Sequence, residues 1–175
     1  ELLAREEANL QSALEHWTSA REVAGALRLV AALGRFWMVR GKWRLGRRWL
    51  RTVLALEPDR TPDGPYVWAL LWDGTIAAAD GDVEPGRTTL ERARTLSAQL
   101  GDRSGEARAL NALGGLSYQV GALEDARARF QQSLQIYEEL GDEWAVAAAL
   151  NNLGSVAAAI GDGDSAVLFA ERSLR

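Results

Sequence analysis

The sequence contains no cysteine and only one histidine, His16. Without cysteine the chain has no disulfide, no thiolate metal ligand and no cysteine nucleophile, and a lone histidine forms no metal-binding cluster. We expect His16 on the surface of an N-terminal helix. No apolar run approaches the length that crosses a membrane as a helix, and no signal peptide is visible. The sequence therefore predicts a cytoplasmic protein that binds no membrane.

Complete signatures of catalysis are also missing. Residues 34–43 contain Gly-Lys but lack the spacing and the following Ser or Thr of a phosphate-binding loop. Residues 115–119 lack the last glycine of a nucleophile elbow. A stretch like a calcium loop begins at Asp162, but Ser173 occupies its twelfth position, where a bidentate Glu is needed. We expect a helix-capping turn there, and a protein that is not an enzyme and needs no cofactor and no metal.

Charge is unevenly distributed along the 175 residues, whose net charge is −4. Residues 1–60 carry eleven Lys or Arg against seven Asp or Glu, and residues 61–175 carry nine against seventeen. The first part is therefore basic and the second acidic. Because the overall balance is not the basic one typical of nucleic-acid-binding domains, we expect no direct contact with nucleic acid.

An internal period of 40 residues organises the chain. When residues 101–135 are laid over 141–175, 12 of 35 positions are identical. The aligned glycines are Gly34, Gly74, Gly114 and Gly154, and then Gly41, Gly81, Gly121 and Gly161. We expect a single repeat array over 1–175, a fragment of a larger protein, because the chain lacks an initiator Met and closes within a helical pattern. Its units are a partial one at 1–20 and repeats at 21–60, 61–100, 101–140 and 141–175.

Each copy has the pattern of helix, tight turn and helix. Apolar residues recur at helical spacing, Gly121 is placed to cap a helix end, and Pro85 falls in a first turn, where proline is tolerated. The fold class predicted is all-α, a right-handed solenoid of antiparallel helix pairs. The predicted helices are 3–19, 22–40, 43–56, 66–80, 83–99, 103–120, 123–139, 143–160 and 163–174.

Glycines in the middle of the predicted helices indicate close packing. Each costs about 1 kcal/mol relative to alanine, and the residue twelve positions later is also small. Small residues facing each other let two antiparallel helices approach closely. We therefore expect Gly114 to face Ala126, and the other copies to repeat the contact.

Leu113, Gly114, Ala126, Phe130 and Ser133 have the spacing of the tetratricopeptide repeat signature, lengthened here to 40 residues. The long form resembles the repeat domain of bacterial MalT-like and AfsR-like (LuxR-type) signal-transduction ATPases. The stretches that carry this resemblance are REEANLQSALEHW at 5–17, GRFWMVRGKWRLGRRWLRTVLAL at 34–56 and ALNNLGSVAAAIGD at 149–162. The resemblance implies a nucleotide-binding module upstream and an effector domain elsewhere in the protein.

In tetratricopeptide arrays the first helices line a concave groove, so the resemblance implies binding there. Asn111 and Asn151 are unusual in mid-helix, and either hydrogen-bond an extended peptide backbone or bond a neighbouring helix. Trp68 is either an anchor for a ligand or part of the core between helices. Arginine side chains along the same stripe favour an anionic guest. The predicted groove residues are Arg28, Arg35, Trp68, Arg108, Asn111, Tyr118, Asn151 and Ser155.

The segment RGKWRLGRRWLR, at 40–51, holds six basic side chains and no acid. Helical spacing places Arg44, Arg47, Arg48 and Arg51 on one side and the aromatic residues on the other. We expect the arginines to form a solvent-exposed face rather than a dedicated phosphate-binding surface. A basic stripe of this kind also suits an acidic partner domain, and the sequence leaves open whether this face or the groove is the main contact surface.

The function predicted is a protein- or ligand-interaction scaffold, the sensor repeat domain of an ATP-dependent transcriptional regulator. The alternative is a passive oligomerisation module. Expected partners are a protein or peptide, an anionic small molecule, the ATPase module of the same chain, and a second copy in a homodimer. The sequence does not identify the ligand.

Overall fold

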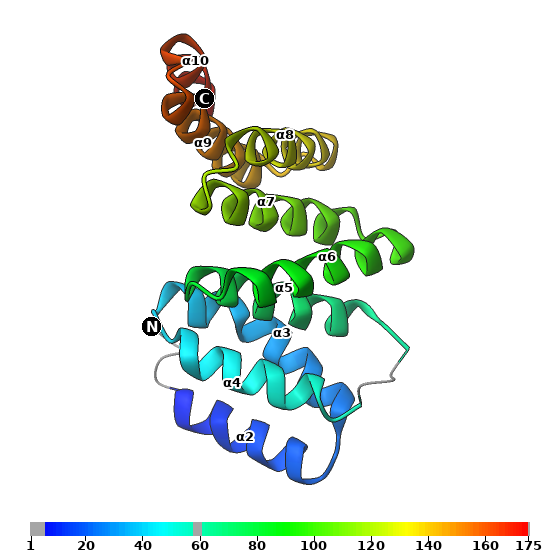
Figure 1. Ribbon diagram of the computed structural model, residues 1–175. Helices are drawn as coiled ribbons and strands as arrows, with labels where there is room; N and C mark the ends of the chain where they lie inside the picture. The colour runs from blue at the N-terminus through cyan, green and yellow to red at the C-terminus, as the bar shows by residue number, and fades with distance from the viewer. Residues whose placement is uncertain (1–5, 58–60, 175) are drawn as a thin grey trace. The chain divides into compact units, whose positions relative to one another are not determined.

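The computed structural model describes residues 6–57 and 61–174, and within them nine α-helices and no strand are present (Figure 1). Consecutive helices form antiparallel pairs, so the predicted all-α architecture of helix pairs is confirmed. Every helix end lies within two residues of its predicted position, except the predicted start at residue 3, which lies outside the described residues. The helices are α2 (Glu7–Ser19), α3 (Val23–Val39), α4 (Trp43–Leu54), α5 (Gly64–Ala79), α6 (Val83–Leu100), α7 (Arg103–Gln119), α8 (Leu123–Leu140), α9 (Glu143–Ile160) and α10 (Gly163–Ser173).

The helices group into two compact units. Unit 1 comprises residues 1–89 and unit 2 comprises residues 90–175, with the boundary inside α6. In unit 1, α3 packs against α4 and α5, and α2 packs against α3. In unit 2, α8 packs against both α7 and α9, and α10 packs against α9. Each unit thus has its own set of helix contacts, and the single array over 1–175 stays a prediction.

Glycine followed by aspartate sets the helix ends in unit 2. Gly101, Gly141 and Gly161 have positive φ angles of 70°, 68° and 90°, which end the preceding helix at little steric cost. The next residue is an aspartate whose carboxylate accepts a hydrogen bond from a backbone N–H three residues later, at 2.9–3.1 Å. The expected helix-capping turn at Asp162 is confirmed, and Gly121, with φ 77°, ends α7 as predicted.

Arg21 occupies the repeat position of Gly101 and Gly141 and keeps their left-handed backbone, with φ 55°. A side chain in this conformation costs roughly 1–2 kcal/mol, whereas glycine adopts it freely. Because the side chain is exposed and makes no described contact with the core, we expect Arg21→Gly to stabilise unit 1 by about 1 kcal/mol. Thermal unfolding of both proteins measures this. The reciprocal Gly141→Arg is the control, and an unchanged melting temperature for both variants would contradict the expectation.

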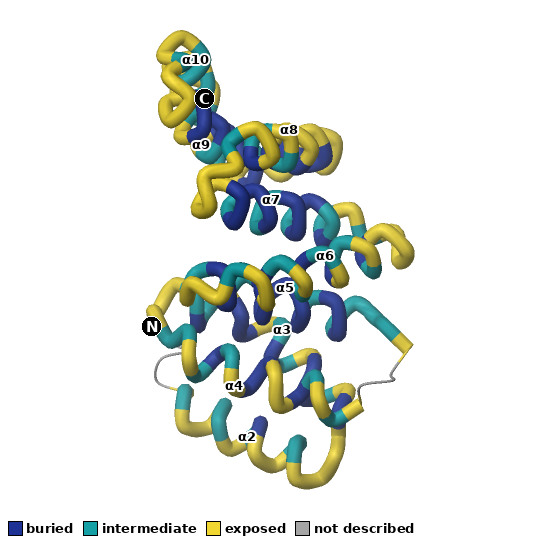
Figure 2. The backbone as a smooth tube through the Cα atoms, viewed as in Figure 1, coloured by how far each residue is buried: buried dark blue, intermediate teal, exposed yellow. Residues whose placement is uncertain are grey.

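The core of each unit consists of the inward stripes of its helices, drawn dark blue in Figure 2. In unit 2, α7, α8 and α9 contribute Leu110, Phe130, Leu134, Leu150 and Leu153, all less than a tenth exposed. In α4, Trp49, Leu50 and Val53 are buried as the sequence predicts. By contrast, α10 buries none of its residues.

The mid-helix glycines make close contacts, but not all of the predicted kind. Gly86 lies against the backbone of Gly74, where a Cβ would be 3.2 Å from the Gly74 carbonyl oxygen, as expected for small residues facing each other. At Gly114 the nearest atoms are those of the Phe130 ring, 2.8 Å from the Cβ position, and the contact with Ala126 stays a prediction. The glycine makes room for an aromatic ring there.

Gly154 contacts the backbone of Ala166, as predicted, with its carbonyl oxygen 3.6 Å from the Cβ position. Gly34 and Gly46 instead lie under the indole rings of Trp72 and Trp37. Glycines at the same position of the 40-residue repeat therefore have two different roles. Some of the glycines allow helix backbones to approach, and others provide the space that a buried ring fills.

Alanine substitutions at the two neighbouring glycines of α7, Gly114 and Gly115, should have opposite effects on stability. Gly114→Ala places a Cβ against the Phe130 ring and should destabilise unit 2 by about 1–2 kcal/mol net, since overpacking outweighs the gain in helix propensity. Gly115→Ala meets nothing within 4 Å and should stabilise the helix by about 0.5–1 kcal/mol. Urea unfolding of the two variants checks both signs at once. Equal changes in the free energy of unfolding would show that packing of the Phe130 ring against position 114 does not contribute to stability.

Candidate interaction surfaces

The first candidate surface lies on α7 and α9, which are neighbouring first helices of unit 2. We define the α7–α9 face by Arg108, Asn111, Tyr118, Asn151 and Ser155, the five predicted groove residues in this unit. Asn152 donates its side-chain N–H to Oδ1 of Asn111 at 3.0 Å, which links the two helices. Of the two alternatives for Asn111, the structure therefore shows the hydrogen bond to a neighbouring helix.

The rest of the α7–α9 face is more open. Asn151 and Ser155 are exposed, and the Ser155 hydroxyl donates to the Asn151 backbone carbonyl at 3.1 Å. Tyr118 is 39% exposed, while Arg108 is half-buried. A Cβ at Gly115 would meet no atom within 4 Å, so this part of α7 is unobstructed.

Two residues of this face were not predicted from the sequence. Trp144 is 66% exposed and stands seven residues before Asn151, so both project from the same side of α9. Asn152 forms the link to Asn111. A signal for Asn152 existed, because the aligned residue of the preceding copy is alanine and only the last copy has two consecutive asparagines.

Unit 1 holds the other three predicted groove residues. Arg28 and Arg35 are exposed on α3, and Trp68 is half-buried on α5. The Arg28 Nε–H donates to the Ala24 carbonyl at 3.3 Å, and Arg28 borders an open hollow of about 500 Å³ together with Trp17 and glutamate side chains. The eight predicted residues thus divide between the two units, three in unit 1 and five in unit 2. The five of unit 2 lie on α7 and α9, which the hydrogen bond between Asn111 and Asn152 links.

The basic stretch of α4 differs from the prediction at one residue. Arg47 is not a solvent-facing side chain, because only 12% of it is exposed and it points toward carboxylates at both ends of the α5–α6 turn. Its Nε lies 3.7 Å from Oδ1 of Asp73, and its guanidinium also reaches Asp80 at 4.0 Å and pairs with Asp82. Arg47 therefore joins helices within unit 1, and the expectation of a four-arginine exposed face is wrong at this position.

Arg44, Arg48 and Arg51 are exposed as predicted, and we call these three the α4 basic surface. Together with Thr52 and Asp80 they border an open hollow of about 490 Å³. None of the three forms an ion pair with the residues that the structure describes. The surface is therefore a group of three exposed cations.

Asp73, the buried partner of Arg47, lies in the middle of the apolar helix α5 and is 8% exposed. Burial raises the pKa of its carboxyl group above the ordinary value of 3.8, and the attraction of Arg47 and Arg51 only partly opposes the rise. A raised pKa means that the folded chain binds this proton more tightly than the unfolded chain. Ionisation of Asp73 therefore reduces stability.

Because ionisation of Asp73 reduces stability, the stability of the protein should depend on pH. As pH rises from 3.8 toward the higher pKa of folded Asp73, the wild type should lose stability relative to Asp73→Asn, which has no proton to release. Denaturant unfolding of both proteins between pH 3 and pH 8 measures the difference. If the wild type instead gains stability over the variant with rising pH, attraction to Arg47 outweighs burial and the pKa is lowered.

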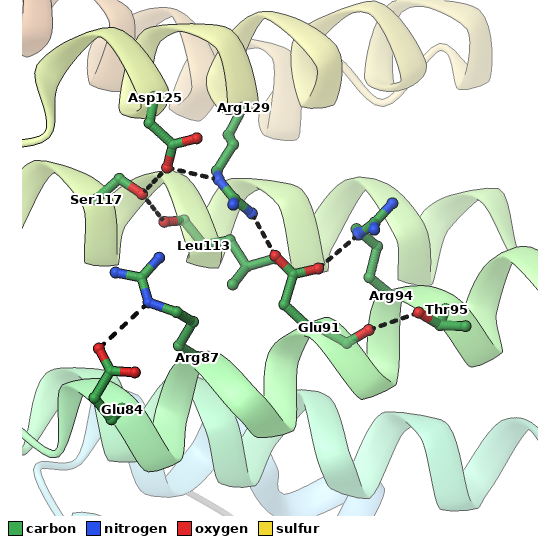
Figure 3. A network of polar contacts seen from close by, with 9 residues as sticks. All are labelled: Glu84, Arg87, Glu91, Arg94, Thr95, Leu113, Ser117, Asp125 and Arg129. Atoms are coloured by element: carbon green, nitrogen blue, oxygen red, sulfur yellow. Dashed lines mark hydrogen bonds and ion pairs between the residues drawn. The ribbon is translucent and has the colours of Figure 1, made fainter.

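In unit 2, ion pairs connect second helices that are one repeat apart (Figure 3). The Arg129 guanidinium on α8 donates to Glu91 on α6 at 2.8 Å and to Asp125 at 2.9 Å. Ser117 of α7 donates to the Leu113 carbonyl and pairs with Asp125. Although burial opposes the shift, hydrogen bonds from Arg129 and Arg94 lower the pKa of Glu91. These charges therefore pair with one another within the protein.

Two other kinds of feature are absent from the part of the chain that the structure describes. No group of three or more His, Cys, Asp or Glu side chains is arranged to hold a metal ion among residues 6–57 and 61–174. Over the same residues, no helix combines the length and the apolar character that crossing a membrane requires.

Solved structures of known proteins share this arrangement of helices. BtubC (BKLC) from P. vanneervenii is 21% identical with a TM-score of 0.77, and the match covers 99% of this chain and 73% of that one. A Rap protein in complex with competence and sporulation factor is 17% identical with a TM-score of 0.80, covering 99% of this chain and 50% of that one. MamA is 16% identical with a TM-score of 0.67, covering 97% and 90%. At these identities the likeness shows the fold alone.

Sequence comparison shows the family. No curated protein sequence matches the chain. None of the three solved structures above is a MalT-like or AfsR-like regulator, so the comparisons bear out the repeat class and not the finer regulator family. A model of the tetratricopeptide repeat matches residues 67–139 and 106–175, which together make up more than half of the chain. The chain therefore belongs to the tetratricopeptide repeat family and is a helical scaffold of the protein-interaction kind.

Proposed function

We propose that the chain binds an extended peptide segment of a protein on the α7–α9 face of unit 2. The observation that carries this proposal is the pairing of an exposed amide, Asn151, with an exposed indole, Trp144, on one side of α9. An amide both donates and accepts, so it matches the alternating N–H and C=O groups of a peptide backbone. An indole supplies a large apolar contact at small entropic cost, which is why tryptophan is common among the strongest binding residues.

The neighbouring residues suit the same ligand. Gly115 leaves open space over α7, and the link from Asn152 to Asn111 holds the two first helices at a fixed spacing. Arg108 and Tyr118 lie on the same face and add a cation and a phenol hydroxyl. A solved structure of the same architecture is a Rap protein complexed with competence and sporulation factor, which supports the proposal at the level of the fold.

Alanine substitutions test the face, with a probe selected for the purpose. A twelve-residue peptide is selected by phage display on the wild-type protein, and its affinity is then measured for each variant by fluorescence anisotropy. We expect Trp144→Ala to weaken binding by at least tenfold and Asn151→Ala by about fivefold, as for loss of an anchor and of one hydrogen bond. Arg108→Ala tests the preference for anionic peptides, which salt should also weaken.

Matched substitutions on the other candidate surfaces serve as controls. Arg35→Ala on α3 and Arg48→Ala on α4 each remove an exposed arginine and should leave the affinity of the selected peptide within twofold of wild type. If only Arg48→Ala loses affinity, the peptide docks on α4 and the proposal for the α7–α9 face is wrong. If only Arg35→Ala loses affinity, the binding surface lies in unit 1.

At a finer level, we propose that the chain is the sensor repeat domain of an ATP-dependent transcriptional regulator, a cytoplasmic protein. The support is the resemblance of residues 5–17, 34–56 and 149–162 to the repeat domains of signal-transduction ATPases. Its natural ligand is then a protein, a peptide or an anionic small molecule, and its ATPase module is part of the same protein. The test is the full-length protein, whose sequence should contain a phosphate-binding loop and whose ATP hydrolysis should respond to ligand binding and be altered by Trp144→Ala.

A second candidate is self-association, and α10 is the observation in its favour. Val167, Leu168 and Leu174 are 60%, 54% and 88% exposed, although all are large apolar residues. Sedimentation velocity over a range of concentrations distinguishes the candidates. A dimer that dissociates on Leu168→Glu substitution supports the oligomerisation module, and a monomer at all concentrations supports the peptide-binding scaffold.

A further inference from the structure

The α4 basic surface reverses the charge found at the same positions of other repeats. Arg44 stands where the later copies have Glu84, Glu124 and Asp164. Arg51 stands where two of them have glutamate, Glu91 and Glu171. The 40-residue alignment thus gives acidic residues at these outward positions of second helices, and α4 departs from it with arginine.

In unit 2, by contrast, arginines of the second helices pair with carboxylates of the same protein. Arginines on second helices of unit 2 reach carboxylates on another second helix, as Arg129 reaches Glu91 and Arg172 reaches Glu138 at 3.0 Å. In the described part of the chain, the α4 arginine that forms ion pairs is Arg47, which pairs with Asp73 of α5 and with Asp82 in the turn between α5 and α6. Among the residues that the structure describes, Arg44, Arg48 and Arg51 have no ion-pair partner, although Arg51 attracts Asp73 from a longer distance.

The three arginines have the geometry of a docking surface. They follow one another at four and three residues along α4 and so span about 10 Å on one side of the helix. They border the open hollow of about 490 Å³, and Thr52 lies beside them. An extended chain advances about 7 Å over two residues, so acidic side chains at alternate positions reach successive arginines. We propose that the α4 basic surface docks an acidic segment of a partner protein, through Asp or Glu carboxylates at alternate positions.

Several observations favour a protein carboxylate over nucleic acid. The Asp80 carboxylate borders the same hollow and repels anions, which opposes the dense charge of a phosphate backbone more than carboxylates spaced at alternate residues. The net charge of the chain is −4, so a long polyanion such as nucleic acid meets more repulsion outside the basic surface than a short acidic peptide, which carries few charges. The arginine fork matches carboxylate geometry, and the neighbouring Arg47 already binds carboxylates in this structure. The site lies in unit 1 and does not depend on the proposed peptide face of unit 2.

Two model peptides test the proposal on the whole chain at low salt. The probe is fluorescein-labelled Glu-Ser-Glu-Ser-Glu, and its matched comparator is Gln-Ser-Gln-Ser-Gln. Because each exposed ion pair contributes a factor of about two to five in affinity, Arg44→Ala, Arg48→Ala and Arg51→Ala combined should weaken binding of the glutamate peptide about tenfold. Arg48→Lys keeps the charge but loses the fork, and should weaken binding about twofold. Circular dichroism of each variant confirms that the helices are retained.

The control combines Arg28→Ala, Arg35→Ala and Arg40→Ala, which removes three exposed arginines of unit 1 away from the hollow. This variant has the same net charge as the α4 variant and should bind within twofold of wild type. Equal losses in both variants, or equal binding of the glutamine peptide, would overturn the proposal in favour of general charge attraction. Absence of wild-type binding would also overturn it. Tighter binding of a twelve-base-pair DNA duplex, lost in the α4 variant, would assign the surface to nucleic acid instead.

Discussion

Arg47→Ala should lower the free energy of unfolding of unit 1 by about 3 kcal/mol. Arg47 is the nearest cation to Asp73, a residue that is 8% exposed in the middle of α5. Removing one member of a buried ion pair leaves the other charge uncompensated, at a cost of roughly 3–5 kcal/mol. Protonation of Asp73 limits the loss, since burial already raises the pKa of that group. The effect should therefore shrink at low pH, where Asp73 is neutral in both proteins.

Urea unfolding at pH 7 and pH 4 measures this cost, with Arg48→Ala as the matched control. Arg48 is one residue away and exposed, so its removal should change stability by less than about 0.5 kcal/mol. The double variant Arg47→Met with Asp73→Leu replaces both charges by apolar groups and should recover most of the loss. Equal stabilities of Arg47→Ala and Arg48→Ala would show that Arg47 is an ordinary surface residue, as the sequence pattern alone suggests.

The contrast between Arg47 and its neighbours shows what a helical pattern determines. Spacing along α4 places four arginines on one side of the helix, but it does not say which of them meets the next helix. A signal was present in Asp73, a charged residue inside the otherwise apolar stretch WALLWDGTIAAA, since such a residue needs a buried partner. The identity of that partner depends on how α4 packs against α5, which local sequence does not specify.

Helix ends were predictable because their chemistry is local. A glycine with positive φ and an aspartate that caps the next helix stand side by side in the chain, so the turn between helices is encoded in two residues. Contacts between repeats were less predictable. Asn111 bonds Asn152 of the following copy, and this pairing depends on the stagger of α7 against α9 rather than on either sequence.

The contacts of the glycines were likewise only partly predictable from the sequence. A 40-residue alignment shows that a small residue is required in mid-helix, but not whether a backbone or a ring occupies the space opposite. At Gly86 it is the backbone of α5, and at Gly114 it is the Phe130 ring. At Gly34 it is the indole of Trp72 from α5, two helices further along the chain. Because of this contact, adding a methyl group at Gly34 should lower stability more than adding one at the other glycines.

Gly34→Ala should destabilise unit 1 by about 2–3 kcal/mol. The new Cβ would overlap Cγ, Cδ1 and Cδ2 of Trp72, which are the ring atoms nearest the backbone, so a change of rotamer at the far end of the side chain gives no relief. Trp72 is 9% exposed, and its displacement therefore disturbs the packing of α5 against α3. Overpacking of this severity exceeds the gain of about 1 kcal/mol that alanine brings to a helix interior.

Three comparisons make the measurement of Gly34→Ala decisive. Gly25→Ala, in the same helix, brings its Cβ to 3.2 Å from the Trp17 ring and should cost less, because a few tenths of an ångström of movement relieve the contact. Gly115→Ala, with open space around it, should stabilise the helix. In the double variant Gly34→Ala with Trp72→Leu, the added alanine should cost much less than it does in wild type, since the ring it strikes is gone. A melting temperature of Gly34→Ala at or above wild type would mean that Trp72 has room to move and that the glycine is not required for packing.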